Sequence, residues 1–543
     1  MWLQGLVVCA CAVLAAADQS WRIVSTDQGP VKGYRAPEGH FVFYGIPYAT
    51  TPIGPNKFKP PLPPPSWDEP FEAIQKYVIC PQRIRDRDTV DVVLNPQEDC
   101  LITNIYVPDT EETNLPVVVY FHGGSYQYGY GNIRTAINLL NSKKIIIVNF
   151  NFRIGAHGLL CLGTEDVPGN AGMKDQIALL RWVHRNIASF GGNPDDVTLN
   201  GWSAGSSAVD LVMISKLARG LFHKVIPESG SSTASFSVQV DPIANAKMIA
   251  KELNFHDVHN ITALEDFYKS IPFETLYSVD VGNQPNSATV FAPCIERYFG
   301  QEMFLDDYPA NILKSGNYPK VPMLYGVTEK EGMFRLSNFD KWKTMMNDNF
   351  ADFLPEDLDF EREEEKEYVV QKIKHFYFGD EPVSERNVLQ YVQYFTDAIF
   401  AYGTAKAVKL QVEAGNNQIY LYEYAYADEN SDYIIHTQTR GATHVAQTNA
   451  VMDLKDEHLL SDAYKKVKVL VRDLWLNFIT TGKPVPEGSS HIPWPPVGQN
   501  RTPFMFIDRD LTLKKHFMQD RALFWDEIYE KYYRVPVPPF PYY

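Results

Sequence analysis

Val197-Thr198-Leu199-Asn200-Gly201-Trp202-Ser203-Ala204-Gly205 is the stretch of sequence that decides the fold. Val197–Leu199 predicts a strand that runs directly into a G-x-S-x-G motif, and Ala204–Ile214 is compatible with a helix. A glycine at each end of the motif suits a tight strand-to-helix turn, because a side chain at either place would clash there. The pattern predicts that Ser203 is exposed on this turn as a nucleophile. The alternative is a structural turn without chemistry.

Four other short runs predict buried strands: Val117–Phe121, Ile145–Phe150, Val321–Tyr325 and Ile419–Tyr424. They are almost continuously apolar, as expected for strands that helices cover on both faces. Apolar residues recur at helical spacing over Asp175–Phe190, which Gly191-Gly192 ends, and over Ala463–Ile479. This alternation predicts an α/β fold with a large, mostly parallel central sheet flanked by helices. Catalytic groups then belong on the loops at the carboxyl ends of the strands.

The bulk composition limits the possible classes of protein. The chain has 543 residues with a globular composition, and neither a linker nor a repeat of fixed period divides it. We therefore expect a single domain over residues 18–543. The net charge of −16 argues against a nucleic-acid partner, because phosphate binding needs clustered Lys and Arg.

The first 17 residues predict a signal peptide. Leu6–Ala17 is a short apolar stretch that ends in three alanines, a pattern that suits cleavage before Asp18. The stretch is too short to span a bilayer, and no later segment reaches the ~20 apolar residues required. Pro538–Tyr543 holds neither a retention signal nor a lipidation motif. We expect a secreted, extracellular protein without a membrane anchor, whose oligomeric state the sequence leaves open.

Four cysteines remain after Cys9 and Cys11 leave with the signal peptide: Cys80, Cys100, Cys161 and Cys294. Cys80 and Cys100 bound a polar loop, and closing a loop of that length contributes ~3 kcal/mol if the pair is oxidised. The apolar neighbours of Cys161 predict a buried free thiol, whereas the state of Cys294 stays open. No pair of cysteines has zinc-like spacing, so we expect no metal.

Two glycosylation acceptors are present. They begin at Asn260, in Asn-Ile-Thr, and at Asn500, in Asn-Arg-Thr. An exported chain could carry glycans at both.

A serine nucleophile needs a base, and the base needs an acid that orients it. In the α/β-hydrolase fold, of which the motif is typical, the chain order is serine, acid, histidine. His444 follows Ile419–Tyr424 by about twenty residues, where a catalytic loop is expected. Glu329 and Glu331 both lie in the loop that follows Val321–Tyr325. Their chemistry alone leaves both open as the acid.

The negative charge that develops on the reacting oxygen needs prearranged N–H donors. His122-Gly123-Gly124-Ser125 follows the strand predicted at Val117–Phe121 and suits a donor loop. We expect the backbone N–H groups of Gly124, Ser125 and Ala204 to form the oxyanion hole. A glycine-rich turn without function is the alternative.

The sequence around these motifs resembles the type-B carboxylesterase family, from about Val31 to the C-terminal helical pattern. The blocks that carry the resemblance are the serine signature Phe190–Gly205, the beginning of a second signature at Glu98–Leu101, Pro168–Gly172 with Asp175-Gln176, and Phe222–Ile226 with Ser229-Gly230. The blocks Leu160–Asn170 and Leu221–Gly230 are most similar to insect esterases, secreted or antennal, that clear odorants or foreign esters.

This resemblance has implications for individual residues. The family's acid directly precedes the glycine that ends its loop, which implies Glu331 rather than Glu329. The resemblance also implies a Cys80–Cys100 disulfide and a role for Phe291 in lining the acyl pocket. It implies no metal or organic cofactor.

Departures from the family pattern bear on the substrate. Cholinesterase-like members place a tryptophan in the first disulfide loop and a glutamate before the serine, but residues 81–99 lack Trp and Trp202 precedes Ser203. A choline head group would therefore lose its partners. Juvenile hormone esterases usually have Gln before the serine and an acidic residue three after the histidine, where this chain has Trp202 and Gln447. Ser125 replaces the third glycine of the oxyanion loop.

The resemblance therefore implies a serine carboxylesterase that cleaves uncharged, largely apolar carboxylic esters through an acyl-enzyme. Small-molecule esters such as odorants, pheromones or foreign compounds in an insect are the expected substrates. Trp202 is expected to line the gorge beside the nucleophile, and the alternative is that it packs the strand. The rival functions are a non-catalytic adhesion or binding protein on the same fold, a juvenile hormone esterase and a lipase.

Overall fold

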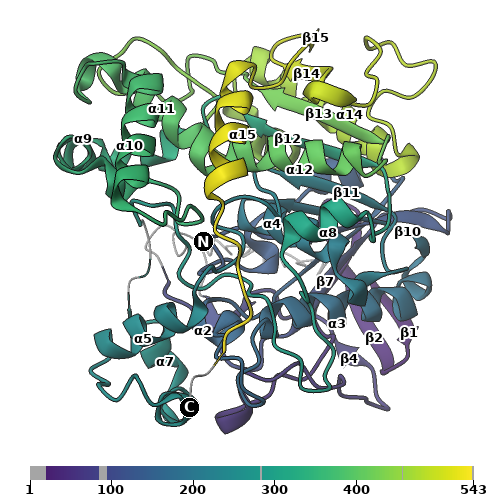
Figure 1. Cartoon of the computed structure of the whole chain (residues 1–543). Coiled ribbons are helices and arrows are strands. Elements are labelled where there is room, and N and C mark those ends of the chain that lie inside the picture. Colours follow the sequence, from purple (N-terminus) through teal and green to yellow (C-terminus); the bar gives the residue numbers. More distant parts are fainter. Residues whose placement is uncertain (1–19, 85–93, 280, 282–283, 455, 541–543) are drawn as a thin grey trace, which may run out of the picture.

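A mixed sheet of 13 strands forms the centre of the molecule (Figure 1). The computed structural model describes residues 20–84, 94–279, 281, 284–454 and 456–540. The signal peptide predicted at residues 1–17 lies outside them.

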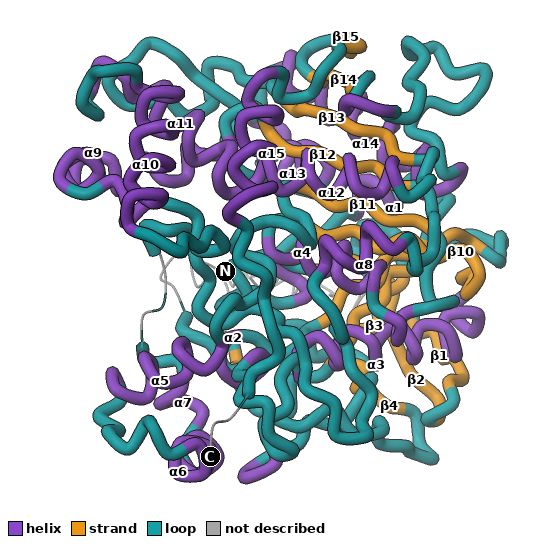
Figure 2. The backbone as a smooth tube through the Cα atoms, viewed as in Figure 1, coloured by secondary structure: helices purple, strands orange, loops and turns teal. Residues whose placement is uncertain are grey.

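The strands follow one another across the sheet from β1 to β15, and Figure 2 shows them as a continuous band. In spatial order they are β1 (Trp21–Thr26), β2 (Gly29–Arg35), β3 (Phe41–Pro47), β7 (Ile102–Val107), β9 (Ile146–Phe150), β8 (Leu115–Phe121), β10 (Gly192–Trp202), β11 (Lys224–Glu228), β12 (Met323–Thr328), β13 (Ile419–Tyr424), β14 (Phe504–Ile507) and β15 (Leu511–Lys514). β4 (Phe71–Glu72) pairs with β2, whereas β5 (Val78–Ile79) and β6 (Asn95–Pro96) form a separate pair.

The strands from β9 to β14 are all parallel, and antiparallel strands complete both edges. This arrangement confirms the predicted α/β-hydrolase type of sheet. Alternate residues of β8 explain its nearly continuous apolar run, because Val117 and Val119 face one apolar cluster while Val118 and Tyr120 face a second on the other side. A strand covered on both faces cannot alternate apolar with polar residues.

Helices cover both faces of the sheet. They are α1 (Ile137–Leu140), α2 (Gly155–Leu159), α3 (Ala171–Asn186), α4 (Ala204–Ile214), α5 (Pro242–Glu252), α6 (Ile261–Ser270), α7 (Phe273–Leu276), α8 (Pro309–Ser315), α9 (Phe339–Asp348), α10 (Glu363–Phe378), α11 (Val388–Phe395), α12 (Tyr402–Glu413), α13 (Ala446–Val451), α14 (Asp462–Thr481) and α15 (Asp520–Tyr532). The apolar residues of α3, α4 and α12 belong to the first cluster, and those of α1, α13 and α14 to the second. None of the described helices is long and apolar enough to cross a membrane.

Two groups of helices are inserted after the carboxyl ends of neighbouring strands. The chain forms α5–α8 between β11 and β12, and α9–α12 between β12 and β13. Figure 1 shows α5 and α7, and separately α9–α11, beside the sheet rather than across it. Both insertions start at the edge of the sheet where the carboxyl ends of the parallel strands lie.

Two disulfides cross-link the part of the chain that the structure describes. The Cys80–Cys100 disulfide is present, with Cα atoms 5.0 Å apart, which confirms the pairing implied by the resemblance. The free thiol predicted at Cys161 is wrong, because Cys161 is bonded to Cys294. The apolar neighbours of Cys161 correctly indicated burial, but burial does not distinguish a thiol from a disulfide. The partner lies 133 residues away, so no local pattern could reveal it.

The second disulfide is embedded in a tightly packed corner. A Cβ atom on Gly169 would lie 2.5 Å from the Cys294 sulfur and 2.6 Å from the Cys161 sulfur, and the φ angle of this glycine is +96°. The neighbouring Asn170 side chain donates to the Cys294 carbonyl at 2.7 Å and accepts from its N–H at 2.9 Å. The segment that follows Phe291 is therefore fixed to the segment between α2 and α3.

Both predicted glycosylation acceptors are exposed. Asn260 precedes α6, and its side-chain oxygen accepts from the N–H of Ala263 at 3.2 Å. Asn500 lies in a turn before β14 and has a φ angle of 57°.

Candidate active site

Ser203 lies in the turn between β10 and α4, as the G-x-S-x-G motif predicts. It has φ 57° and ψ −125°, a conformation that places it outside both the strand and the helix. A Cβ atom on Gly201 would lie 2.2 Å from the carbonyl oxygen of Gly205, and one on Gly205 would lie 2.2 Å from that of Phe121. Neither position admits a side chain. The Ser203 N–H donates to the carbonyl of Glu228 at 2.9 Å, which ties the turn to β11.

His444 joins the serine to an acid. Its Nε2 lies 2.9 Å from the Ser203 Oγ, and its Nδ1 lies 2.5 Å from a carboxylate oxygen of Glu331. The three residues come from the carboxyl ends of β10 and β12 and from the loop after β13. The Phe400 ring stacks on the imidazole with its centroid 4.3 Å away. The histidine can therefore accept the serine proton at one nitrogen while the other remains bonded to the acid.

Glu331 is fully buried, and it rather than Glu329 lies beside His444. Its second carboxylate oxygen accepts from the Ser229 hydroxyl at 2.5 Å and from the N–H of Thr328 at 2.7 Å. Glu329 is partly exposed, pairs with Lys330 at 3.2 Å, and lines a separate cavity of about 270 Å³. The structure thus distinguishes Glu331 from Glu329 by position, whereas their chemistry alone did not distinguish them.

Ser229 and Gln447 also belong to this constellation, although neither was predicted to. Ser229 follows β11 and reaches Glu331, while the Gln447 side chain donates to the Ser229 Oγ at 2.6 Å. Both residues are fully buried. A polar residue at the carboxyl end of the strand next to β10 was the available signal for Ser229. Gln447 stood out only as a departure from the pattern of related esterases.

The loop after β8 lies against the serine turn. A Cβ atom on Gly123 would be 2.6 Å from the carbonyl oxygen of Trp202, so the two segments are in contact. Gly124 has a φ angle of 121° and no room for a side chain, and Ser125 has a φ angle of 52°. Among the described residues, no backbone carbonyl accepts from the N–H of Gly124 or Ser125. Ala204 is the first residue of α4, where an N–H has no partner within the helix.

The two residues predicted to line the substrate pocket are almost completely buried. Trp202 is 6% exposed and packs within the apolar cluster on the α14 side of the sheet. The guanidinium of Arg134 lies 5.7 Å from the centroid of its ring. Phe291 is 2% exposed, and its carbonyl accepts from the side chain of Gln127, in the loop after β8, at 3.1 Å.

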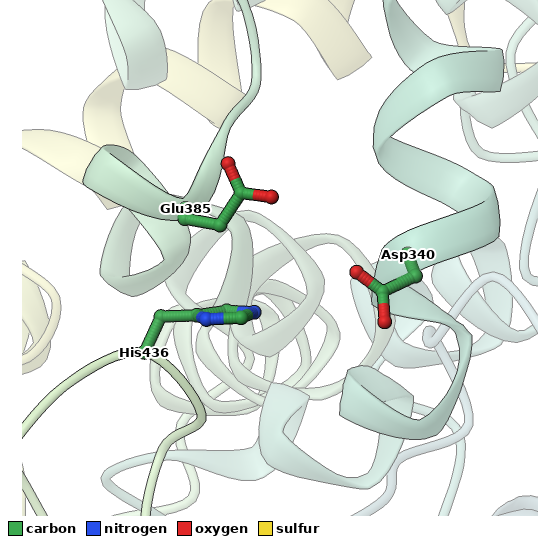
Figure 3. A group of neighbouring side chains, drawn as sticks. All are labelled: Asp340, Glu385 and His436. Carbon is green, nitrogen blue, oxygen red and sulfur yellow. The ribbon is translucent and has the colours of Figure 1, made fainter.

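One group of side chains has the composition of a metal site. Figure 3 shows Asp340, Glu385 and His436 converging from three segments, and their potential ligand atoms lie within 4.8 Å of one another. All three residues are exposed. The ammonium group of Lys343 already binds both acids, Asp340 at 3.0 Å and Glu385 by a short ion pair. We assign this group to surface ion pairing and not to a metal.

A serine, a histidine and a carboxylate bonded in series at the carboxyl ends of parallel strands define a serine hydrolase of the α/β-hydrolase fold. Residues 20–525 match the family described as "Carboxylesterase family", and the chain belongs to that family. It is a serine carboxylesterase, a carboxylic ester hydrolase, which confirms the class of enzyme that the resemblance implies.

Relatives from insects match nearly the whole chain. A "Carboxylic ester hydrolase" of Bombus ignitus is 30% identical and covers 96% of this chain and 98% of its own length. "Venom carboxylesterase-6" of Apis mellifera is 31% identical and covers 89% of each chain. The crystal structure of juvenile hormone esterase from Manduca sexta, with OTFP covalently attached, has a TM-score of 0.82 at 26% identity and covers 94% of this chain and 100% of its own.

Proposed function

We propose that this carboxylesterase hydrolyses uncharged, largely apolar esters through an acyl-enzyme formed on Ser203. The observation that carries the proposal is the position of His444, which bonds to the Ser203 hydroxyl and to Glu331 at the same time. A serine hydroxyl is a weak nucleophile by itself, and a base in this position activates it.

Acylation begins when the Ser203 Oγ attacks the carbonyl carbon of the ester while His444 takes the hydroxyl proton. Glu331 stabilises the imidazolium that forms. The N–H groups of Gly124, Ser125 and Ala204 would bind the oxyanion of the tetrahedral intermediate, and their position in and beside the serine turn supports this role. The carbon–oxygen bond to the alcohol then breaks, and His444 returns its proton to the leaving alcohol.

Deacylation repeats these steps with water. His444 takes a proton from a water molecule, and the resulting hydroxide attacks the acyl carbon. The bond to the Ser203 Oγ breaks, the serine recovers its proton from His444, and the carboxylic acid leaves. No metal or organic cofactor takes part in this mechanism.

The residue that precedes Ser203 supports a preference for neutral esters. Trp202 occupies the position where cholinesterase-like enzymes place a glutamate, and the Arg134 guanidinium lies over its ring. A cationic alcohol group would therefore lack the carboxylate partner that those enzymes provide at this position. We infer that odorant, pheromone or foreign esters are better candidates than choline esters.

The proposed location is extracellular. The apolar N-terminal segment, the two disulfides and the exposed acceptors Asn260 and Asn500 support export through an oxidising compartment. We propose that residues 18–543 form the mature enzyme as one domain.

A substrate panel with a nucleophile variant tests the proposal. The panel holds nitrophenyl esters of increasing acyl length, choline esters and juvenile hormone esters, all measured as kcat/KM. We expect turnover of the neutral esters, weak turnover of choline esters, and a loss of about 10³- to 10⁶-fold in kcat for Ser203→Ala. The fold of the variant is checked by its melting temperature.

Two results would contradict the proposal. More than a few per cent of the wild-type activity in folded Ser203→Ala would disprove the nucleophile. Equal kcat/KM for choline esters and neutral esters of matched size would disprove the substrate class.

A further inference from the structure

Gln447 is a buried amide three residues after His444, and the mechanism above gives it no role. It lies in the first turn of α13, and its side chain is completely covered. Its Nε2 lies 2.6 Å from the Ser229 Oγ, which in turn lies 2.5 Å from a carboxylate oxygen of Glu331. Gln447 is therefore connected through one hydroxyl to the acid that holds His444.

The chemistry of these groups determines the direction of each hydrogen bond. An ionised carboxylate can only accept, so the Ser229 hydroxyl must donate its single proton to Glu331. The Ser229 oxygen is then left as an acceptor towards Gln447. Gln447 must therefore present its NH₂ group, and not its carbonyl oxygen, to Ser229. The chain of donors runs from Gln447 through Ser229 to Glu331.

We propose that Gln447 is a positioning residue. It orients the Ser229 hydroxyl so that this group donates its hydrogen bond to Glu331. Gln447 thereby fixes how many hydrogen bonds the Glu331 carboxylate accepts, and so how strongly its negative charge acts on His444. The proposal rests on the proposed roles of Glu331, His444 and Ser203. Gln447 touches neither the ester nor a reacting atom, so it acts only through Ser229.

The adjacent residue of α13 has a parallel attachment. The Thr448 hydroxyl donates to a carboxylate oxygen of Glu228 at 2.6 Å, so Gln447 and Thr448 bond to two consecutive residues, Ser229 and Glu228 respectively. The helix that follows His444 is thus held to the last residue of β11 and to the residue after it. This attachment keeps Gln447 in reach of Ser229.

Charged and titratable groups contact α13 or the residues bonded to it, and Arg472 of α14 donates to the carbonyls of Val451 and Met452 at the end of α13. Glu228 comes from β11, Glu331 follows β12, Tyr422 comes from β13, Lys468 from α14 and Arg134 from the segment before α1. Burial raises the pKa values of Glu228 and Tyr422. Tyr422 lies next to Gln447 as a neutral phenol, Arg134 lies near Glu228, and Lys468 donates to backbone carbonyls of α13.

A carboxylate in place of Gln447 would change this environment in two ways. It cannot donate to Ser229, so it would compete with Glu331 for the hydroxyl proton. It would also add a negative charge near Glu331. Both changes favour the protonated imidazole of His444, because a nearby negative charge stabilises a cation. The base would then be blocked by a proton at higher pH than in the wild-type enzyme.

Two variants of similar size test the proposal on a neutral nitrophenyl ester. For Gln447→Glu we expect the acid limb of the kcat/KM profile to move to higher pH by about one unit. For Gln447→Met, which loses the donor without adding charge, we expect kcat to fall about tenfold with KM nearly unchanged. Gln411→Met is the matched control, because Gln411 is a buried amide on α12 whose side-chain atoms have no partner among the described residues. It should change neither readout.

Removing Ser229 shows whether Gln447 acts through it. In a Ser229→Ala background, Gln447→Met should cause no further loss of kcat, since the connection to Glu331 is already broken. An additional tenfold loss in that background would overturn the proposal. A wild-type acid limb and wild-type kcat in both folded Gln447 variants would also overturn it.

The Ser203→Ala variant of the enzyme distinguishes a failure of this inference from a failure of the proposed function. If Ser203→Ala is inactive while the Gln447 variants behave like wild type, only the role of Gln447 is wrong. If Ser203→Ala remains active, the proposed function itself fails. If neither Gln447 variant folds, Gln447 is a purely structural residue and the proposal is overturned.

Discussion

Glu329 and Glu331 show how two identical side chains, two residues apart, acquire different surroundings. Glu331 is buried, bonded to His444, and held by Ser229 and Thr328. Glu329 is partly exposed and pairs with the adjacent Lys330. The difference arises because β12 ends at Thr328 and the following 3₁₀ segment begins at Glu331, which directs the two side chains to different surroundings.

The two acids are separated by one pair of variants. We expect Glu331→Gln to lose roughly 10⁴-fold in kcat, because the imidazolium then lacks a charged partner. Glu329→Gln should remain within about twofold of wild type. The measurement is kcat on a neutral nitrophenyl ester, with melting temperatures to confirm folding. Reversed effects would transfer the role of the acid to Glu329.

Trp202 is proposed to influence substrate choice, although its side chain is almost completely buried. We expect Trp202→Glu to improve the choline-to-neutral ratio of kcat/KM relative to Trp202→Gln, by about tenfold for a gain of ~1.4 kcal/mol. A carboxylate beside Ser203 would attract a cationic alcohol, and the glutamine variant controls for loss of the indole. Equal ratios in two folded variants would mean that Trp202 only packs the core.

At the scale of single residues, sequence reasoning located Ser203 and His444 from their motifs and positions. The choice of Glu331 needed the resemblance to a family, because both acids suit the chemistry. Ser229 and Gln447 could not be assigned a role, because their contact joins residues 218 positions apart and depends on the fold. A short motif predicts the candidate nucleophile, but contacts between distant residues determine which groups support it.

Among the secondary-structure elements, the buried centre of the sheet was the most predictable part. β13 has the predicted limits, and β8 begins two residues before the predicted run. The edge strands β1 and β15 were not predicted, because they are largely exposed and lack a continuous apolar run. The predicted helix at Asp175–Phe190 is α3 followed by a 3₁₀ turn, which ends where Gly191 adopts a φ angle of 92°.

Helix α2 contains a histidine in an unfavourable environment. Both ring nitrogens of His157 are buried without a hydrogen-bond partner among the described residues. Burial lowers the pKa of His157 to about 3, and the nearby charges of Arg153 and Lys57 act in the same direction. The folded protein therefore keeps this histidine neutral, whereas the unfolded chain protonates it below pH ~6.5. The resulting loss of stability grows as the pH falls from about 6.5 towards 3.

Replacing this side chain should stabilise the protein in a pH-dependent way. We expect His157→Phe to raise the free energy of unfolding, with a gain about 2 kcal/mol larger at pH 5 than at pH 8. Urea unfolding at the two pH values measures the difference. The exposed His184→Phe is the control and should show little pH dependence. An equal gain for His157→Phe at both pH values would contradict the assigned cause.

At the scale of the whole molecule, the Cys161–Cys294 disulfide closes a loop that contains α3–α7 and Ser203. Such a cross-link restricts the unfolded chain most strongly when the loop is long. Long-range pairing of this kind was beyond sequence reasoning, whereas the family resemblance supplied the shorter Cys80–Cys100 pair. The overall sheet was predictable because its central strands carry local signals.

Removing the second disulfide should lower stability without removing the active site. We expect the double variant Cys161→Ala/Cys294→Ala to lose about 2–5 kcal/mol in free energy of unfolding. Non-reducing peptide mapping of the wild-type protein should show both disulfide-linked peptides. Labelling of Cys161 by a thiol reagent in the native, unreduced protein would disprove the bond.

The distance in sequence between Ser203 and His444 has a consequence for the time at which the enzyme becomes active. The two residues are 241 positions apart, so a ribosome that has incorporated the serine works for roughly 10–50 s more before it adds the histidine. During that interval the nascent chain already contains the proposed nucleophile, but it lacks the proposed base. Ester hydrolysis can therefore begin only late in synthesis, after His444 has been added to the chain. Chains that are still bound to ribosomes therefore cannot hydrolyse esters inside the cell during that period.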